Sequence, residues 1–203
     1  MQAVSPAGHP EQGHRDDRLV GPALELLRPY GFEVMHDVRS PGRPPAEIDH
    51  VVVGPPGVFV MNTESWSGAV TVHEETLRQN GYTRVQQTEA VHRSALVVGL
   101  SLGAAWAALV VPVICLFGSA ALAPTQAGPV SVLSLDHLVG WLLSQPGRLA
   151  PPGVQQVVRS LRIAFPGESA MAQPTRAPAR IRLPKSQRRA PLQLERRAVE
   201  RRE

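Results

Sequence analysis

The chain has 203 residues, of which 43% are hydrophobic, and a formal net charge of +4. This length suits one domain with tails and is too short for two full hydrophobic cores. Cys115 is the single cysteine, which excludes an intrachain disulfide framework and a multi-cysteine zinc site. Residues 171–203 contain nine arginines and one lysine against three glutamates, so residues 1–170 carry a net charge of about −3.

The first predicted elements are a leader and a helix. Residues 1–14 have no apolar run, so we expect a mobile leader without a secretory signal and a cytoplasmic protein. A helix follows, and its regular part is expected to begin only at Pro22. Pro29-Tyr30-Gly31 is expected to end it. The apolar face of this helix is predicted to comprise Leu19, Ala23, Leu26 and Leu27.

Strands are predicted next, at residues 32–38, 48–53 and 58–63, because these segments are β-branched or alternate between apolar and polar residues. The segment Gly54-Pro55-Pro56-Gly57 separates the second and third strands and predicts a hairpin loop. Residues 69–73 are extended in pattern and are expected to continue the same meander.

The second half of the chain alternates between helical and strand patterns. Helices are predicted at 84–102, 135–143 with Ser134 as N-cap, and 153–164; strands are predicted at 110–117 and 129–133. The order of these elements predicts a single α/β sheet domain. We expect three parts: the leader at 1–14, the domain at 15–165 and a Pro/Arg-rich tail at 166–203.

One apolar stretch, at residues 95–117, is long enough to cross a bilayer, and no charge lies between Arg93 and Asp136. A membrane anchor is therefore an alternative. Gly103 divides the stretch, and Pro112 would remove a hydrogen bond from a helix. The pattern favours a helix followed by a buried strand, and membrane association is not expected.

The predicted hairpin brings polar side chains together. If Val53 faces Val58, Asp49 faces Asn62 and Glu47 faces Glu64, and strand alternation places all four side chains on one face. Oxygen-rich clusters of this kind suit Mg²⁺ or Mn²⁺. The alternative is a set of solvent-facing residues on an antiparallel sheet.

Residues 48–68 read IDHVVVGPPGVFVMNTESWSG and resemble the central motif of the nuclease-related domain (NERD) family. Residues 32–42 and 111–118 resemble a preceding and a later strand of that family, so the resemblance covers about residues 15–145. It implies a restriction-endonuclease-like fold, with a central mixed sheet and an antiparallel hairpin flanked by helices. It also implies a divalent metal, Mg²⁺ or Mn²⁺, if the site is active.

The resemblance assigns roles to particular positions. Asp49 matches the family's metal-binding aspartate, Asn62 stands where an acid is usual, and Glu64 stands where the catalytic lysine belongs. Asp17 is the nearest match to a glutamate of the early helix. The one lysine, Lys185, lies in the tail. We therefore expect a catalytically impaired protein, a pseudoenzyme retained for nucleic-acid or partner binding. The alternative is an active metal-dependent nuclease that uses Glu47, Asp49 and Glu64 in an altered arrangement.

The remaining candidates are weaker. Histidines 36, 50, 73 and 92 lie in different elements without metal-ligand spacing and are expected to be ordinary surface or core residues. Cys115 is expected to be a buried hydrophobe, and no small-molecule cofactor is expected. The tail is the candidate nucleic-acid contact, and a tail without a dedicated partner is the alternative. Its contact residues are predicted to be Arg188, Arg189, Arg196 and Arg197.

Overall fold

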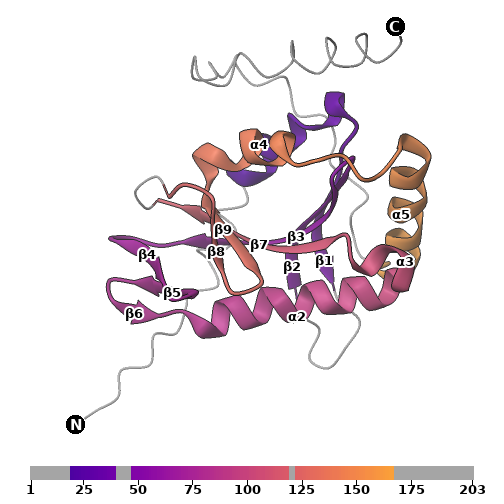
Figure 1. Ribbon diagram of the computed structural model, residues 1–203. Helices are drawn as coiled ribbons and strands as arrows, with labels where there is room; N and C mark the ends of the chain where they lie inside the picture. Colours follow the sequence, from indigo (N-terminus) through magenta and orange to yellow (C-terminus); the bar gives the residue numbers. More distant parts are fainter. Residues whose placement is uncertain (1–18, 40–46, 119–121, 167–203) are drawn as a thin grey trace, which may run out of the picture. The chain divides into compact units, whose positions relative to one another are not determined.

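The computed structural model describes residues 19–39, 47–118 and 122–166 (Figure 1). The strands of the larger sheet are β1 (Glu33–Arg39), β2 (Glu47–Gly54), β3 (Gly57–Ser65), β7 (Val110–Phe117), β8 (Thr125–Ala127) and β9 (Val130–Ser134). A smaller sheet contains β4 (Val70–His73), β5 (Thr76–Gln79) and β6 (Tyr82–Thr83). Residues 19–25 form an N-terminal helix. The later helices are η1 (Arg28–Tyr30), α2 (Val85–Leu102), α3 (Ala104–Ala107), α4 (Leu135–Ser144) and α5 (Pro151–Ala164).

The larger sheet is mixed and has the order β1-β2-β3-β7-β9-β8. The β1–β2, β2–β3 and β8–β9 pairs are antiparallel, whereas β3–β7 and β7–β9 are parallel. A parallel neighbour requires a crossover, and the segment from β4 to α3 supplies it between β3 and β7. The predicted α/β fold, with a central mixed sheet and an antiparallel hairpin, is confirmed.

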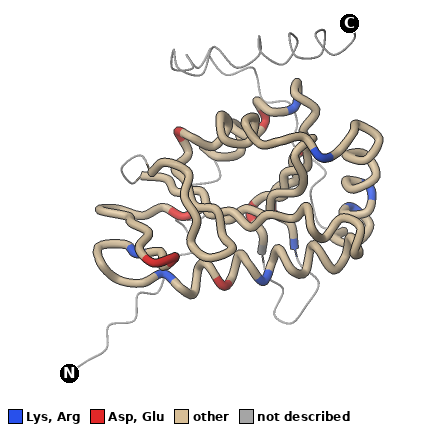
Figure 2. The backbone as a smooth tube through the Cα atoms, viewed as in Figure 1, with Lys and Arg blue, Asp and Glu red and all other residues tan. Residues whose placement is uncertain are grey.

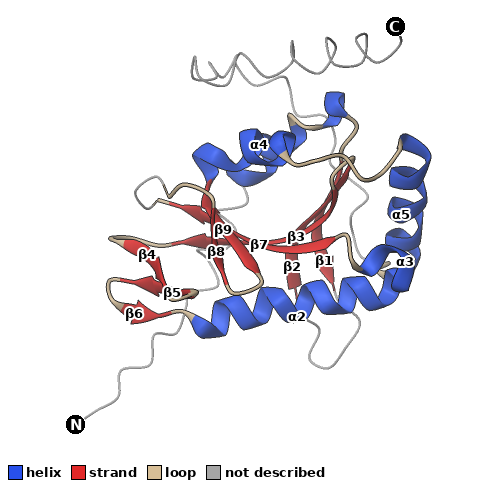
Figure 3. Cartoon of the chain, in the orientation of Figure 1, coloured by secondary structure: helices blue, strands red, loops and turns tan. Residues whose placement is uncertain are grey.

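Helices cover both faces of the larger sheet (Figure 3). On one face, α2 and α5 pack against strand residues that include Met35, Val51 and Val60. On the other face, the N-terminal helix and α4 pack against residues that include Val52, Phe59 and Cys115. A third core, which contains Trp66 and Leu77, joins the smaller sheet to α2, β7 and β9. The predicted buried stripe of α5 is confirmed, with Val154, Val157, Val158 and Leu161 all buried.

The hairpin between β2 and β3 depends on two glycines that lie against other segments. A Cβ atom added to Gly54 would lie 2.1 Å from the Phe32 ring. Gly57 has a φ of +147°, and a Cβ there would lie 2.6 Å from the Leu109 carbonyl oxygen. That oxygen accepts the backbone N–H of Val58 at 2.9 Å. The close approach of the backbone, rather than the turn alone, therefore requires glycine at both positions.

Three expectations for the first half of the chain are wrong, in whole or in part. The N-terminal helix is already formed at residue 19, so Gly21 and Pro22 lie within it and do not interrupt it. Its buried face comprises Val20, Leu24 and Leu27, while Leu19 and Leu26 are 47% and 38% exposed. Residues 70–73 do not extend the meander, because both edges of β3 are already paired, one with β2 and one with β7.

Two further expectations hold only in part. Ser134 is the N-cap residue of α4, but its hydroxyl makes no cap bond; it donates to the Leu122 carbonyl at 3.1 Å instead. The stretch 95–117 divides at Gly103, as predicted, into the end of α2 and the strand β7, with the short α3 between them. Among the described residues no helix is long and apolar enough to cross a membrane.

Candidate active site

The hairpin has the predicted register. Val53 pairs with Val58 and Gly54 with Gly57, and the pairing continues to His50 and Met61. On the other side of β2, His50 pairs with His36 of β1. Asp49, Asn62 and Glu64 therefore lie just beyond the last β2–β3 pair, and the latter two lie on the part of β3 that pairs with β7.

Asp49 links the two strands at this point. Its Oδ2 accepts a hydrogen bond from the backbone N–H of Thr63, with a nitrogen–oxygen distance of 2.6 Å. Strand alternation is interrupted nearby, because Ile48 packs in the same core as Val51 and Val53. Asp37, opposite this segment in β1, has a positive φ of 49°. The Asp49 side chain thus has a role in joining β2 to β3.

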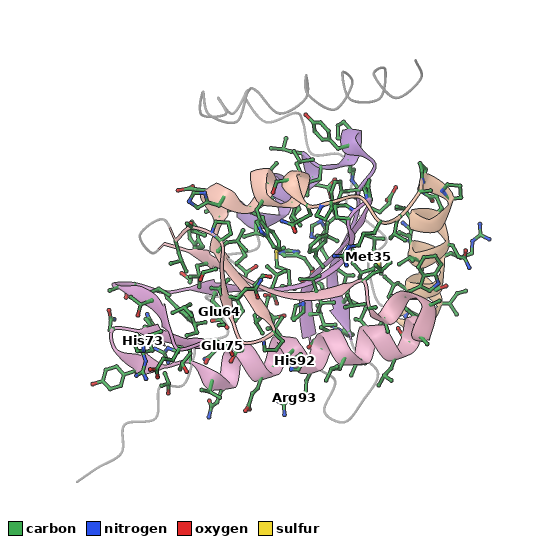
Figure 4. All side chains as sticks on the ribbon, viewed as in Figure 1. Met35, Glu64, His73, Glu75, His92 and Arg93 are labelled. Atoms are coloured by element: carbon green, nitrogen blue, oxygen red, sulfur yellow. The ribbon has the colours of Figure 1, made fainter. Side chains whose placement is uncertain are left out.

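Glu64 is half-buried and contacts an aromatic residue two positions further along the chain. Its Oε2 accepts a hydrogen bond from Trp66 Nε1 at 3.0 Å. The Arg84 guanidinium lies over the Trp66 ring, 5.4 Å from its centroid, and also donates to Gln79. Gln79 in turn donates to the Ser67 carbonyl at 2.9 Å. Figure 4 shows Glu64 beside the smaller sheet, close to the start of α2. Glu64 therefore belongs to a network that attaches the smaller sheet to α2.

Asn62, which lies between Asp49 and Glu64 in the sequence, has a neutral amide side chain. Its Oδ1 atom is buried and accepts no hydrogen bond from the described residues. The Thr63 hydroxyl oxygen is also buried and has no protein hydrogen-bond partner among them. Buried polar atoms of this kind are uncommon, because leaving them unsatisfied costs about 1–3 kcal/mol each.

The described side chains do not fit a protein-held divalent cation. Across residues 19–39, 47–118 and 122–166, no three His, Cys, Asp or Glu side chains come close enough to hold a metal ion. Asp49 Oδ2 is bonded to a backbone N–H and Glu64 Oε2 to an indole N–H. Hard-cation sites in proteins draw on several oxygen ligands that converge on one point. The described side chains therefore supply no converging set of such ligands.

A histidine pair that the sequence does not signal lies on the other face of the same strands. His36 Nδ1 and His50 Nδ1 are 2.8 Å apart, and His36 Nε2 lies 3.2 Å from Glu25 Oε1. Burial, together with the charge of His36, lowers the pKa of His50 to about 3. Arg28 hydrogen-bonds to Glu25 and holds the pKa of that carboxyl below its usual value. Only the fold brings Glu25 and the two histidines together, because their spacing in the sequence has no recognisable pattern.

Several predicted residues lie outside this site or outside the described residues. Asp17, the leader and the tail arginines fall in segments that the structure does not describe, as does the Glu47 side chain. Cys115 is fully buried in β7, and burial raises the pKa of its thiol to about 12. His73 and His92 lie on β4 and α2, away from the histidine pair. Sequence reasoning missed the Trp66–Arg84 network. Glu64 lies near the end of β3 and Trp66 directly after it, and a spacing of two residues in extended chain would have indicated their contact.

The sequence comparisons decide the family. The family model for the nuclease-related domain matches residues 12–116, just over half of the chain. This chain belongs to the nuclease-related domain family. The match extends from residue 12 into β7, so it contains the hairpin and the candidate site residues Asp17, Glu47, Asp49, Asn62 and Glu64. No curated protein and no solved structure matches the chain.

The hairpin lies within the part of the chain that matches the nuclease-related domain family. In this NERD domain the hairpin is formed and its register is the predicted one. The three motif positions Asp49, Asn62 and Glu64 lie on adjacent strands of it. The side chains at the second and third of these positions are an amide and a carboxylate.

Proposed function

We propose that this NERD domain has lost the metal-and-lysine route of nucleic-acid hydrolysis and that the protein serves to bind nucleic acid. The observation that carries the proposal is Glu64. A carboxylate occupies the position of the family's lysine, and its Oε2 is engaged by Trp66 Nε1. The active-site scaffold is therefore retained while a residue of opposite charge stands at its centre.

The sign of the charge at position 64 matters for hydrolysis. A lysine there helps to orient the attacking water and stabilises the negative charge that develops on the phosphoryl oxygens. A glutamate places negative charge where the phosphate must approach, which raises the barrier instead. Lys185 is the one lysine in the chain and lies in the tail. Arg84 is linked to Glu64 through Trp66, but an arginine stays protonated and does not act as a base.

Binding of nucleic acid is supported by the distribution of charge. The tail from residue 171 carries nine arginines and one lysine against three glutamates, while the rest of the chain is mildly acidic. Arginines that contact phosphates do not read the base sequence, and their attraction for nucleic acid weakens as the salt concentration rises. We expect weak, sequence-independent binding of DNA or RNA through the tail, with Arg188, Arg189, Arg196 and Arg197 as contacts.

The experiment follows binding and cleavage in the same samples. Full-length protein is incubated with plasmid and with linear DNA, in Mg²⁺ or Mn²⁺, and the products are separated with and without prior removal of protein. The proposal expects retarded DNA that is intact once the protein is removed. Metal-dependent cleavage that Asp49→Asn abolishes would overturn it and support an active nuclease with an altered acidic site. Asn is the suitable substitution, because its carbonyl still accepts the Thr63 N–H.

A further inference from the structure

The C-terminal half of α2 has an exposed apolar face. The outward positions of the helix run from Gln86 and Glu89 through Arg93 to Leu96 and Leu100. Leu96 is 54% exposed and Leu100 is 82% exposed, the highest value among the large exposed hydrophobic residues of the described chain. The alanines of α3 that follow are also exposed, at positions 104, 105 and 107. Exposed leucines one turn apart on a helix are a feature of interaction surfaces.

The helix that packs beside this face is basic and has an exposed apolar residue of its own. α5 contains Arg159 and Arg162, both exposed, and Ile163, which is 76% exposed. It contains no acidic residue, and Figure 2 shows α5 with blue and without red segments. α2 and α5 share one core, so both cover the same face of the larger sheet.

Basic residues outnumber acidic residues in the part of the chain that forms this face. Residues 90–166 contain four arginines and one acidic residue, Asp136. Asp136 lies in the first turn of α4, which packs on the opposite face of the sheet. Arg93 projects away from α2 on the side turned from the sheet (Figure 4). Glu89, in the N-terminal half of α2, is the one acidic residue on that outward row.

The composition of this surface disfavours two kinds of partner, nucleic acid and a second copy of the chain. Nucleic acid would match the arginines but would leave the exposed leucines in water. A second copy of the chain would cover the leucines but would bring arginines against arginines. An anionic lipid bilayer accepts both groups, because apolar side chains enter the headgroup region while arginines remain with the lipid phosphates.

We propose that Leu96, Leu100, α3 and the arginines of α5, here termed the α2–α5 surface, bind the surface of an anionic lipid bilayer. The attachment is peripheral and differs from the membrane anchor considered for residues 95–117, since β7 stays in the sheet. Each arginine near an anionic surface strengthens binding about fivefold at low salt. The leucines supply the part of the affinity that salt does not screen.

The experiment measures co-sedimentation of the full-length protein with phosphatidylglycerol vesicles and with phosphatidylcholine vesicles, at low and high salt. The test variant is Leu96→Gln with Leu100→Gln. Its matched control is Leu19→Gln with Leu26→Gln, which removes two exposed leucines from the N-terminal helix and the turn after it, on the opposite face. A third variant replaces Arg188, Arg189, Arg196 and Arg197 by glutamine. If the α2 double variant melts at a lower temperature than the control, Leu100→Gln alone replaces it as the test variant.

The proposal expects the wild-type protein to sediment with phosphatidylglycerol vesicles and not with phosphatidylcholine vesicles. The α2 double variant should bind about tenfold or more weakly, and the control should bind like wild type. Absence of wild-type binding overturns the proposal. The proposal is also overturned if the α2 double variant binds phosphatidylglycerol vesicles as tightly as the wild-type protein, including the case in which only the tail variant loses binding. An α2 variant that converts a dimer to a monomer without affecting vesicle binding would assign the face to a second copy. Weakened DNA binding with unchanged vesicle binding would assign it to nucleic acid.

Discussion

At the scale of single residues, Asp49 and His50 are neighbours in β2 that face different environments. Asp49 makes a hydrogen bond of the charge-assisted kind, from a carboxylate to the Thr63 N–H of the next strand. His50 is turned into the core that the N-terminal helix covers, against His36. Asp49 thus stabilises the hairpin, and its neighbour introduces a buried titratable group.

The buried His50 makes stability depend on pH. Its pKa is lowered from 6.5 to about 3 in the folded chain, so the unfolded chain binds one more proton between these values. Stability is therefore full above pH 6.5 and falls as the pH drops below it, by about 1.4 kcal/mol per pH unit. Urea unfolding at several values between pH 7 and pH 5 measures this slope, above the range in which Glu25 titrates.

Two substitutions separate His50 from the other histidines. His50→Gln should remove most of the slope between pH 7 and pH 5. His73→Gln changes a histidine whose side chain is 73% exposed and should leave the slope unchanged. Equal slopes in the His50 variant and the wild-type protein would show that this histidine does not control the acid sensitivity.

At the scale of elements, Trp66 joins the smaller sheet to the rest of the domain. It is 8% exposed, packs in the third core, accepts the Arg84 guanidinium over its ring and donates to Glu64. Trp66→Ala should cost about 3–5 kcal/mol of unfolding free energy, because it leaves a large cavity. Hydrogen exchange should accelerate in β4–β6 more than in β1–β3.

Trp66→Phe is the comparison for this prediction. It keeps an aromatic ring in the core but removes the N–H that Glu64 accepts and part of the indole ring, so the expected cost is smaller, about 1–2 kcal/mol. If Trp66→Phe and Trp66→Ala destabilise the protein equally, the hydrogen bond to Glu64, rather than the core, holds the smaller sheet. Faster exchange in β1–β3 than in β4–β6 would contradict the assigned role of Trp66.

Local patterns predicted the elements whose signals lie within a few residues. The loop at Gly54–Gly57 sets the register of β2 and β3, and the stripe of α5 follows from its 3.6-residue period. The separate β4–β6 sheet was not predictable in this way, because it depends on β7 pairing with β3 from more than forty residues away. The same holds for the site. The Asp49–Thr63 link follows from the hairpin, whereas the contacts of Arg84 and the Glu25–His36–His50 group depend on packing between distant segments.

At the scale of the whole molecule, the tail and the rest of the chain have net charges of opposite sign. Residues 1–170 carry a net charge of about −3, whereas residues 171–203 contain nine arginines and one lysine against three glutamates. Under the proposed function, the first part opposes phosphate and the tail attracts it. Deleting residues 171–203 should therefore remove most binding to DNA or RNA at low salt. The melting temperature should hardly change, because the deleted segment has few core-forming residues. Fluorescence anisotropy at two salt concentrations measures the binding. A truncated protein that binds as tightly as the full chain would place the phosphate contacts in the domain.

The central claim is that hydrolysis is lost at positions 62 and 64 of an otherwise retained scaffold. The most direct measurement is the rate of plasmid cleavage in Mn²⁺ by the wild-type protein, beside a variant with Asn62→Glu and Glu64→Lys. The account predicts intact plasmid with the wild-type protein and cleavage by the double variant, which Asp49→Asn in the same variant abolishes. Cleavage by the wild-type protein that requires Asp49 would contradict it.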